Sequence, residues 1–115
     1  MIDNPDKTAA LVAGLKANLP LPARPTADSL KTLRQQPSMR DFPPECSITD
    51  IYYAGDEGGI LCTLDFGLED SKEVAIVSIT HLRFDRNAPL SRETAQYQRH
   101  RVKKLRQLQR RPYQA

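Results

Sequence analysis

The sequence predicts an α+β domain in which a three-stranded antiparallel β-meander packs on a long C-terminal helix, preceded by a short N-terminal helical hairpin. Residues 47–80 contain three runs rich in β-branched or apolar residues, separated by two short polar turns. Residues 90–111 contain neither Gly nor Pro and repeat apolar residues at helical spacing. The length of 115 residues fits one domain of ordinary size.

Two short helices are predicted before the sheet. Asn4 and Pro5 form a typical helix start, and Leu11, Val12 and Leu15 follow at helical spacing. The three prolines of residues 20–25 cannot continue that helix. Thr26 is a suitable cap for a second helix, which Pro37 ends.

These features divide the chain into four segments. Residues 1–40 form the helical hairpin or arm, and residues 41–46 form a proline-rich linker. Residues 47–111 form the βββα core domain, and residues 112–115 are a tail. The sequence leaves open whether the arm packs on the core.

The three strands differ in their patterns. Residues 47–54 form the first strand, and the GDEGG sequence of residues 55–59 is a turn. In residues 60–66, apolar residues alternate, which places Ile60, Cys62, Leu64 and Phe66 on one face. Residues 73–80 are the most apolar run, which predicts the central or best-buried strand.

The long helix has two chemically different faces. At about 100° per residue, one face gathers the residues expected to pack on the sheet: Leu90, Thr94, Tyr97, Leu105 and Leu108. The opposite face carries a basic stripe of five residues: Arg92, Arg99, Lys103, Arg106 and Arg110.

The charge layout favours a polyanionic partner for this stripe. Net charge is +1 over residues 1–45, −6 over residues 46–80 and +8 over residues 81–115. Like charges at helical spacing repel one another by roughly 0.2–0.5 kcal/mol per pair, and a solvated helix face more often intersperses acids, whereas this helix has only Glu93. The stripe therefore favours contact with nucleic-acid phosphates. The alternatives are a solvated basic face without a partner and an acidic protein partner.

Arg101 lies within the apolar face, between Tyr97 and Leu105. A buried guanidinium needs a carboxylate, and Asp50 and Asp65 lie within strand patterns. We therefore expect a structural ion pair, with Asp65 as the predicted partner of Arg101.

A second group of polar residues follows the third strand. His81, Arg83 and Arg86 together have the chemistry of a phosphate or small-ligand site, although a polar exit loop explains the same pattern. Cys46, Cys62, His81 and His100 lack the close pairs of a zinc site, so no metal and no cofactor are expected. Tyr52 and Tyr53 should point to opposite faces of the first strand, which leaves one ring free to stack on a base or partner.

From Thr26 onward, the predicted order α-β-β-β-α resembles the double-stranded-RNA-binding domain, which also has a basic last helix. The resemblance covers residues 26–111. That family places its basic cluster at the start of the helix, whereas Lys103 and Lys104 lie late in this one. The family's Gly-Pro-x-His loop is absent, and the acidic GDEGG turn stands instead.

Together these features predict a small cytoplasmic, non-enzymatic protein that contacts nucleic-acid backbone through the basic stripe. The alternative is a protein-interaction module that docks an acidic partner or forms a homo-oligomer, with a homodimer through the exposed sheet as one form. No apolar run is long enough to cross a membrane, and the two cysteines do not form a disulfide framework.

Overall fold

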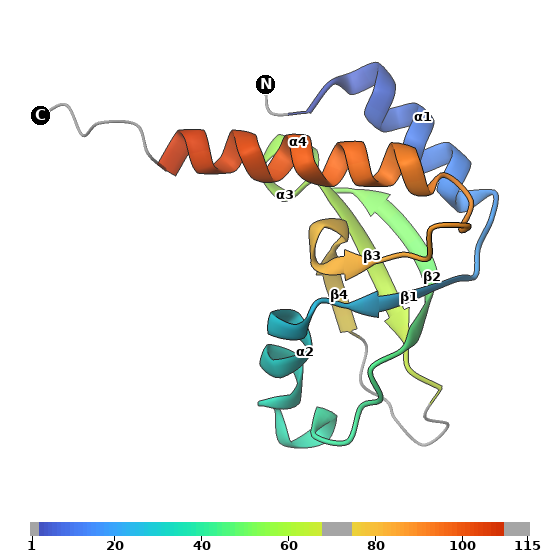
Figure 1. The fold of residues 1–115 in the computed structure, drawn as a ribbon, viewed down its shortest axis with the longest axis vertical. Coiled ribbons are helices and arrows are strands. Elements are labelled where there is room, and N and C mark those ends of the chain that lie inside the picture. Colours follow the sequence, from blue (N-terminus) through green and yellow to red (C-terminus); the bar gives the residue numbers. More distant parts are fainter. Residues whose placement is uncertain (1–2, 68–74, 110–115) are drawn as a thin grey trace, which may run out of the picture.

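The chain forms an α+β structure built on a five-stranded antiparallel sheet, with strand order β4-β3-β2-β1-β5 (Figure 1). The computed structural model describes residues 3–67 and 75–109. The helices are α1 (Pro5–Lys16), α2 (Ala27–Arg34), the short α3 (Gly55–Gly58) and α4 (Ser91–Gln109), with 3-10 turns η1 (Pro37–Met39) and η2 (Ile79–His81). The strands are β1 (Leu21–Pro25), β2 (Cys46–Tyr53), β3 (Ile60–Asp65), β4 (Ala75–Ser78) and β5 (Leu82–Arg83).

The predicted starts of the first two helices are confirmed. The side chain of Asn4 accepts a hydrogen bond from the Lys7 amide at 3.0 Å, and Pro5 occupies the first helical turn of α1. Thr26 caps α2 by accepting a hydrogen bond from the Ser29 amide at 3.4 Å. Both helices contribute apolar side chains to the core, including Leu15 of α1.

The predicted helical hairpin is wrong, because a strand separates the two helices. β1 pairs with β2 on one side and with β5 on the other. Proline ends a helix, yet its fixed φ suits extended backbone, and Leu21, Ala23 and Pro25 alternate inward along the strand. The proline-rich break between the helices therefore becomes part of the sheet.

The predicted meander is present as β2, β3 and β4, which are antiparallel neighbours. The expected central place of the third strand is wrong: β4 lies at the sheet edge, and Ile76 is 50% exposed. Its apolar sequence suggested an interior strand, but only alternate residues face the core. β3 follows its prediction, with Ile60, Cys62 and Leu64 buried on one face.

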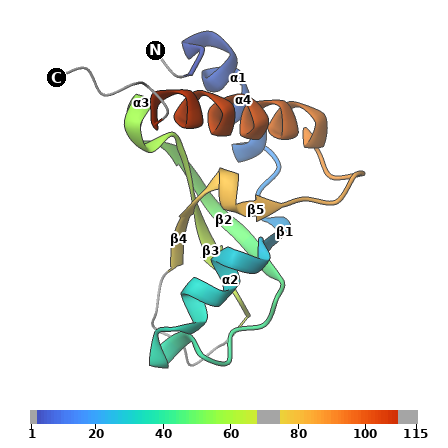
Figure 2. The ribbon, with the colours of Figure 1, turned by 60° about the vertical axis from the view of Figure 1, so that its left-hand side comes forward.

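The core lies on the sheet face that the helices cover. α1 and α4 lie side by side over one end of the sheet, and α2 lies toward its other end (Figures 1 and 2). Gly14 permits the close approach of α1 to α4, since a Cβ there would lie 2.6 Å from Leu90 Cδ1. At the other end, Phe42 and Phe66 stack with ring centroids 4.6 Å apart. The opposite face carries Tyr52, Leu61, Thr63 and Ile76, none of them buried.

The expected turn at residues 55–59 contains a one-turn helix, α3 (Gly55–Gly58), which Gly59 caps. Gly59 has φ +69°, and a Cβ at this position would lie 2.6 Å from Nε of Arg101 and 2.9 Å from the Tyr97 hydroxyl. Only glycine allows both this backbone conformation and the close approach of α4.

Gly59→Ala should therefore destabilise the protein by about 3 kcal/mol or more, because it combines backbone strain with a clash against a buried side chain. Gly55 is the matched control, since it also has a positive φ but has no atom within 4 Å of an added Cβ. Gly55→Ala should cost only the strain, about 1–2 kcal/mol. Urea unfolding of both variants measures the difference, and equal losses would contradict the prediction.

Candidate nucleic-acid interface on α4 and the buried cluster beneath it

Four residues of the predicted basic stripe lie exposed on α4. Arg92, Arg99, Lys103 and Arg106 all point away from the core, while Arg110 lies outside the described residues. Among the residues that the structure describes, no salt bridge joins these four cations to an acid. The four side chains are therefore accessible to solvent, and no described residue forms a salt bridge with them.

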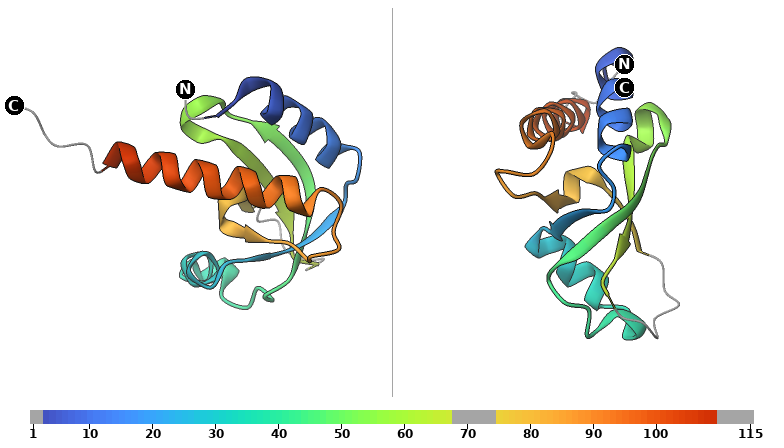
Figure 3. Two further views of the ribbon diagram at one scale, coloured as in Figure 1. Left: turned by 45° about the horizontal axis from the view of Figure 1, so that its top comes forward. Right: turned by 90° about the vertical axis from the view of Figure 1, so that its right-hand side faces the viewer.

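α4 extends past the end of the sheet, and its last turns project from the body of the molecule (Figures 1 and 3). Thr94 and Tyr97 are buried on the core side, and Leu90 packs against the core, as predicted. The expected packing of Leu108 is wrong, because Leu108 is 51% exposed. Its helical phase is correct, but no strand lies beneath the projecting end.

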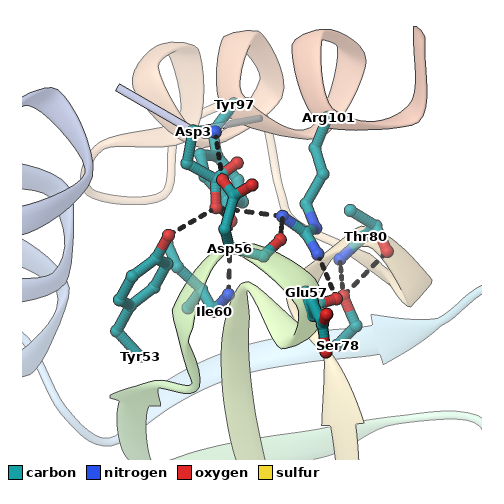
Figure 4. Close-up of polar contacts among 9 residues, drawn as sticks. All are labelled: Asp3, Tyr53, Asp56, Glu57, Ile60, Ser78, Thr80, Tyr97 and Arg101. Carbon is teal, nitrogen blue, oxygen red and sulfur yellow. Dashed lines mark hydrogen bonds and ion pairs between the residues drawn. The ribbon is translucent and has the colours of Figure 1, made fainter. Parts of the chain in front are cut away.

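Arg101 forms a buried ion pair, and its partner is Asp3 (Figure 4). Nη1 of Arg101 lies 2.9 Å from Oδ2 of Asp3, and the two side chains are 3% and 0% exposed. The predicted partner Asp65 is wrong: it lies on the other face of the sheet, where Oδ1 accepts a hydrogen bond from the Gly67 amide. Asp50, the other carboxylate considered for this ion pair, accepts a hydrogen bond from the Ile51 amide.

The rest of the guanidinium is bound by backbone carbonyls of α3. Nη1 donates to the Asp56 carbonyl at 2.9 Å, and Nη2 donates to the Glu57 carbonyl at 2.7 Å. These bonds connect α4 to the helix between β2 and β3. The Asp3 amide in turn donates to Oδ1 of Asp56 at 3.0 Å.

Two tyrosines complete this cluster around Asp3. The hydroxyls of Tyr53 and Tyr97 donate to Oδ2 of Asp3 at 2.9 and 3.0 Å. The Tyr97 hydroxyl also accepts a hydrogen bond from the Ile60 amide at 3.2 Å. Burial, with the nearby Asp3 carboxylate, raises the pKa of the Tyr97 hydroxyl, so it stays a donor at neutral pH. The cluster connects the N-terminal segment, β2, α3 and α4 through polar contacts. This arrangement agrees with the structural role expected for Arg101.

The two tyrosines of β2 point to opposite faces, as their alternation predicts. Tyr53 faces Asp3, whereas Tyr52 pairs with Leu61 on the uncovered face and is half-buried. Tyr53 is 42% exposed, so neither ring lies in the core, and the stacking of one ring on a base or partner stays a prediction.

The structure separates the three residues predicted as a ligand site after the third strand. His81 is exposed at the end of η2, and its carbonyl accepts a hydrogen bond from the Thr26 amide. Arg83 lines a hollow of about 400 Å³, together with Arg24. Arg86 lines a second hollow of about 410 Å³, together with Arg92. His81 lines neither hollow.

Both cysteines are free and buried. Burial raises the pKa of the Cys46 thiol to about 11 and that of the Cys62 thiol to about 12. Both thiols are protonated at neutral pH, and they behave as small apolar core residues. Within the described part of the chain, no three His, Cys, Asp or Glu side chains form a group that could hold a metal ion.

Comparison with known proteins assigns no family to the chain: no family model, no curated protein sequence and no solved structure matches it. In the described ranges, no helix combines the length and apolar character needed to cross a membrane.

Arg101→Ala should lower the free energy of unfolding by about 3–5 kcal/mol, because it leaves the Asp3 carboxylate buried and unpaired. Arg99→Ala removes an exposed arginine from the same helix and should change stability by no more than about 0.5 kcal/mol. Thermal and urea unfolding compare the two variants. Equal melting temperatures would contradict the structural role of Arg101.

Stability should fall in alkaline solution. A thiol whose pKa is raised on folding keeps its proton longer in the folded state, so the unfolded chain ionises first. The stability from this difference is fully present below the ordinary cysteine value of 9.0 and is lost as the pH rises toward 11. Urea unfolding from about pH 8 to about pH 10 should show the decline. Cys46→Ala with Cys62→Ala should make it shallower; an unchanged decline would exclude the thiols as its source.

Proposed function

We propose that the protein binds nucleic-acid backbone through the basic stripe of α4 and acts without catalysing a reaction. The observation that carries the proposal is the stripe itself: four exposed cations on one helix, with no salt bridge to an acid in the described part of the chain. Arg92 and Arg106 are separated by about 21 Å along the helix, at 1.5 Å per residue. This length is enough for contact with several phosphates.

The expected recognition is largely independent of sequence. Arginine and lysine side chains on the outer face of a helix that is packed against a sheet contact phosphates more readily than base edges. Asp56 and Glu57 of the acidic middle segment lie on the core side of α4, where their backbone carbonyls bind Arg101, so the stripe faces away from them. The polymer therefore meets an uncompensated positive surface.

A salt titration of binding to labelled duplex DNA, duplex RNA and single-stranded RNA tests the proposal. With four or five phosphate contacts, log K should fall against log salt with a slope of about −4 on B-DNA. Arg99→Ala should reduce that slope by about one unit, because it removes one contact. Comparison of the affinities for the three polymers identifies which nucleic acid the protein prefers.

Arg40→Ala is the matched control, since Arg40 is an exposed arginine at the end of η1, away from α4. It should leave both the slope and the affinity unchanged. Absence of binding to all three polymers at low salt would overturn the proposal, and an equal loss in Arg40→Ala and Arg99→Ala would show that only total charge matters.

A second function is favoured by the projecting end of α4. Leu105 is half-buried and Leu108 is 51% exposed, and exposed Lys103, Lys104 and Arg106 flank them. A basic helix with an uncovered apolar side suits an acidic groove on a protein partner. Leu108→Ser separates the two functions: it should abolish capture of a protein partner after nuclease treatment, but it should leave phosphate contacts intact.

A further inference from the structure

Arg24 and Arg83 lie directly opposite each other on adjacent strands. They are register partners in the antiparallel pair of β1 and β5, and both are exposed. Directly opposed residues on one face have Cβ atoms about 5 Å apart, and like charges in that arrangement repel. An anion bound between the two arginines would reduce this repulsion.

No neighbouring acid offsets this repulsion by direct contact. Across residues 3–67 and 75–109, the structure contains no salt bridge to Arg24 or Arg83. Arg24 and Arg83 both line a hollow of about 400 Å³, which lies within the usual range of small-ligand pockets.

The hollow also contains negative charge. Glu45, Asp65 and Asp85 line it, and Phe66 adds an aromatic surface. A simple anion would gain from the arginines but would be repelled by three carboxylates, and a simple cation would meet the reverse. A ligand that carries both charges satisfies both groups.

Although β5 is short, hydrogen bonds from other segments hold the backbone next to Arg83 in place. Nε2 of Gln98 on α4 donates to the carbonyls of Ile79 and Leu82 at 2.7 and 2.8 Å, and Leu82 is buried. The Thr26 amide also donates to the carbonyl of His81 at 2.8 Å. These bonds fix the segment that leads into Arg83, so little order of this backbone must be gained when a ligand binds.

We propose that this hollow binds a small zwitterion, with an oxyanion across Arg24 and Arg83 and an amino group toward the carboxylates. Two guanidinium forks can donate several parallel hydrogen bonds to one phosphate, so a phosphate monoester suits the pair better than a carboxylate. The proposal keeps Arg83 from the predicted ligand residues and adds Arg24, which the sequence offered no reason to place there. It is independent of the nucleic-acid stripe on α4.

Titration calorimetry with three probes tests the proposal on the full chain. Phosphoethanolamine should bind about tenfold more tightly than inorganic phosphate, and ethanolamine alone should bind most weakly. If inorganic phosphate binds as tightly as phosphoethanolamine, the proposed preference for a zwitterion is wrong. If phosphoethanolamine gives no heat at millimolar concentration, the site itself is wrong.

Variants test which residues bind the phosphate of the ligand and which bind its amino group. Arg83→Gln should weaken phosphoethanolamine at least about tenfold. Asp65→Asn should remove the advantage over inorganic phosphate, and its amide oxygen can still accept the Gly67 amide, so the loop is retained. Arg99→Ala is the control and should bind the probes normally. Because Arg99→Ala alters only the nucleic-acid salt slope, failure of this proposal is distinguishable from failure of the proposed function. Unchanged affinity in Arg83→Gln, with an unchanged melting temperature, would overturn the site.

Discussion

The buried ion pair between Arg101 and Asp3 determines how the helices are held on the sheet. One carboxylate oxygen accepts hydrogen bonds from two tyrosines as well as from the guanidinium. Two further donors of Arg101 bind backbone carbonyls of α3. A buried arginine is unfavourable unless its charge and its donors find partners, and this one is bound from two separate segments, Asp3 near the N-terminus and α3. Gly59 then follows as a requirement, since a larger residue would occupy the space of the guanidinium.

The ion pair also lies where the two halves of α4 begin to differ. As far as Arg101, one side of the helix rests on a packed surface, and the charge that Arg101 places on that side is neutralised by Asp3. Beyond Arg101 it continues without a sheet beneath it, so both its cations and its leucines reach solvent (Figure 3). The residues available to a macromolecular partner are those that the body of the molecule does not use. The Arg24 and Arg83 pair shows the same division, because the inward side of β1 packs in the core while its outward side carries unpaired charge.

Local patterns in the sequence predicted the elements whose causes are local. Asn4 and Pro5 start a helix, residues 60–65 alternate, and the stripe residues of α4 share one exposed face, all from chemistry within a few positions. Features that depend on distant residues were missed. Prolines indicated only that a helix must end before β1, because the pairing partners of β1 lie in β2 and β5. Asp3 gave no sign of its role, since nothing near it in sequence shows that a buried guanidinium lies above it. Leu108 was misplaced because helical phase gives direction but not the extent of the sheet.

Asp3 and Arg101 are 98 residues apart in the chain. A ribosome adds about 5–20 residues per second, so the carboxylate waits roughly 5–20 seconds before its partner is even synthesised. β1 waits in the same way for β5, its neighbour on one side. During that interval the cluster around Asp3 is incomplete, because Tyr97 and Arg101 are both synthesised late. Closure of the domain is therefore a late step of its biosynthesis, and nascent chains that stall before residue 101 lack the contact that secures α4.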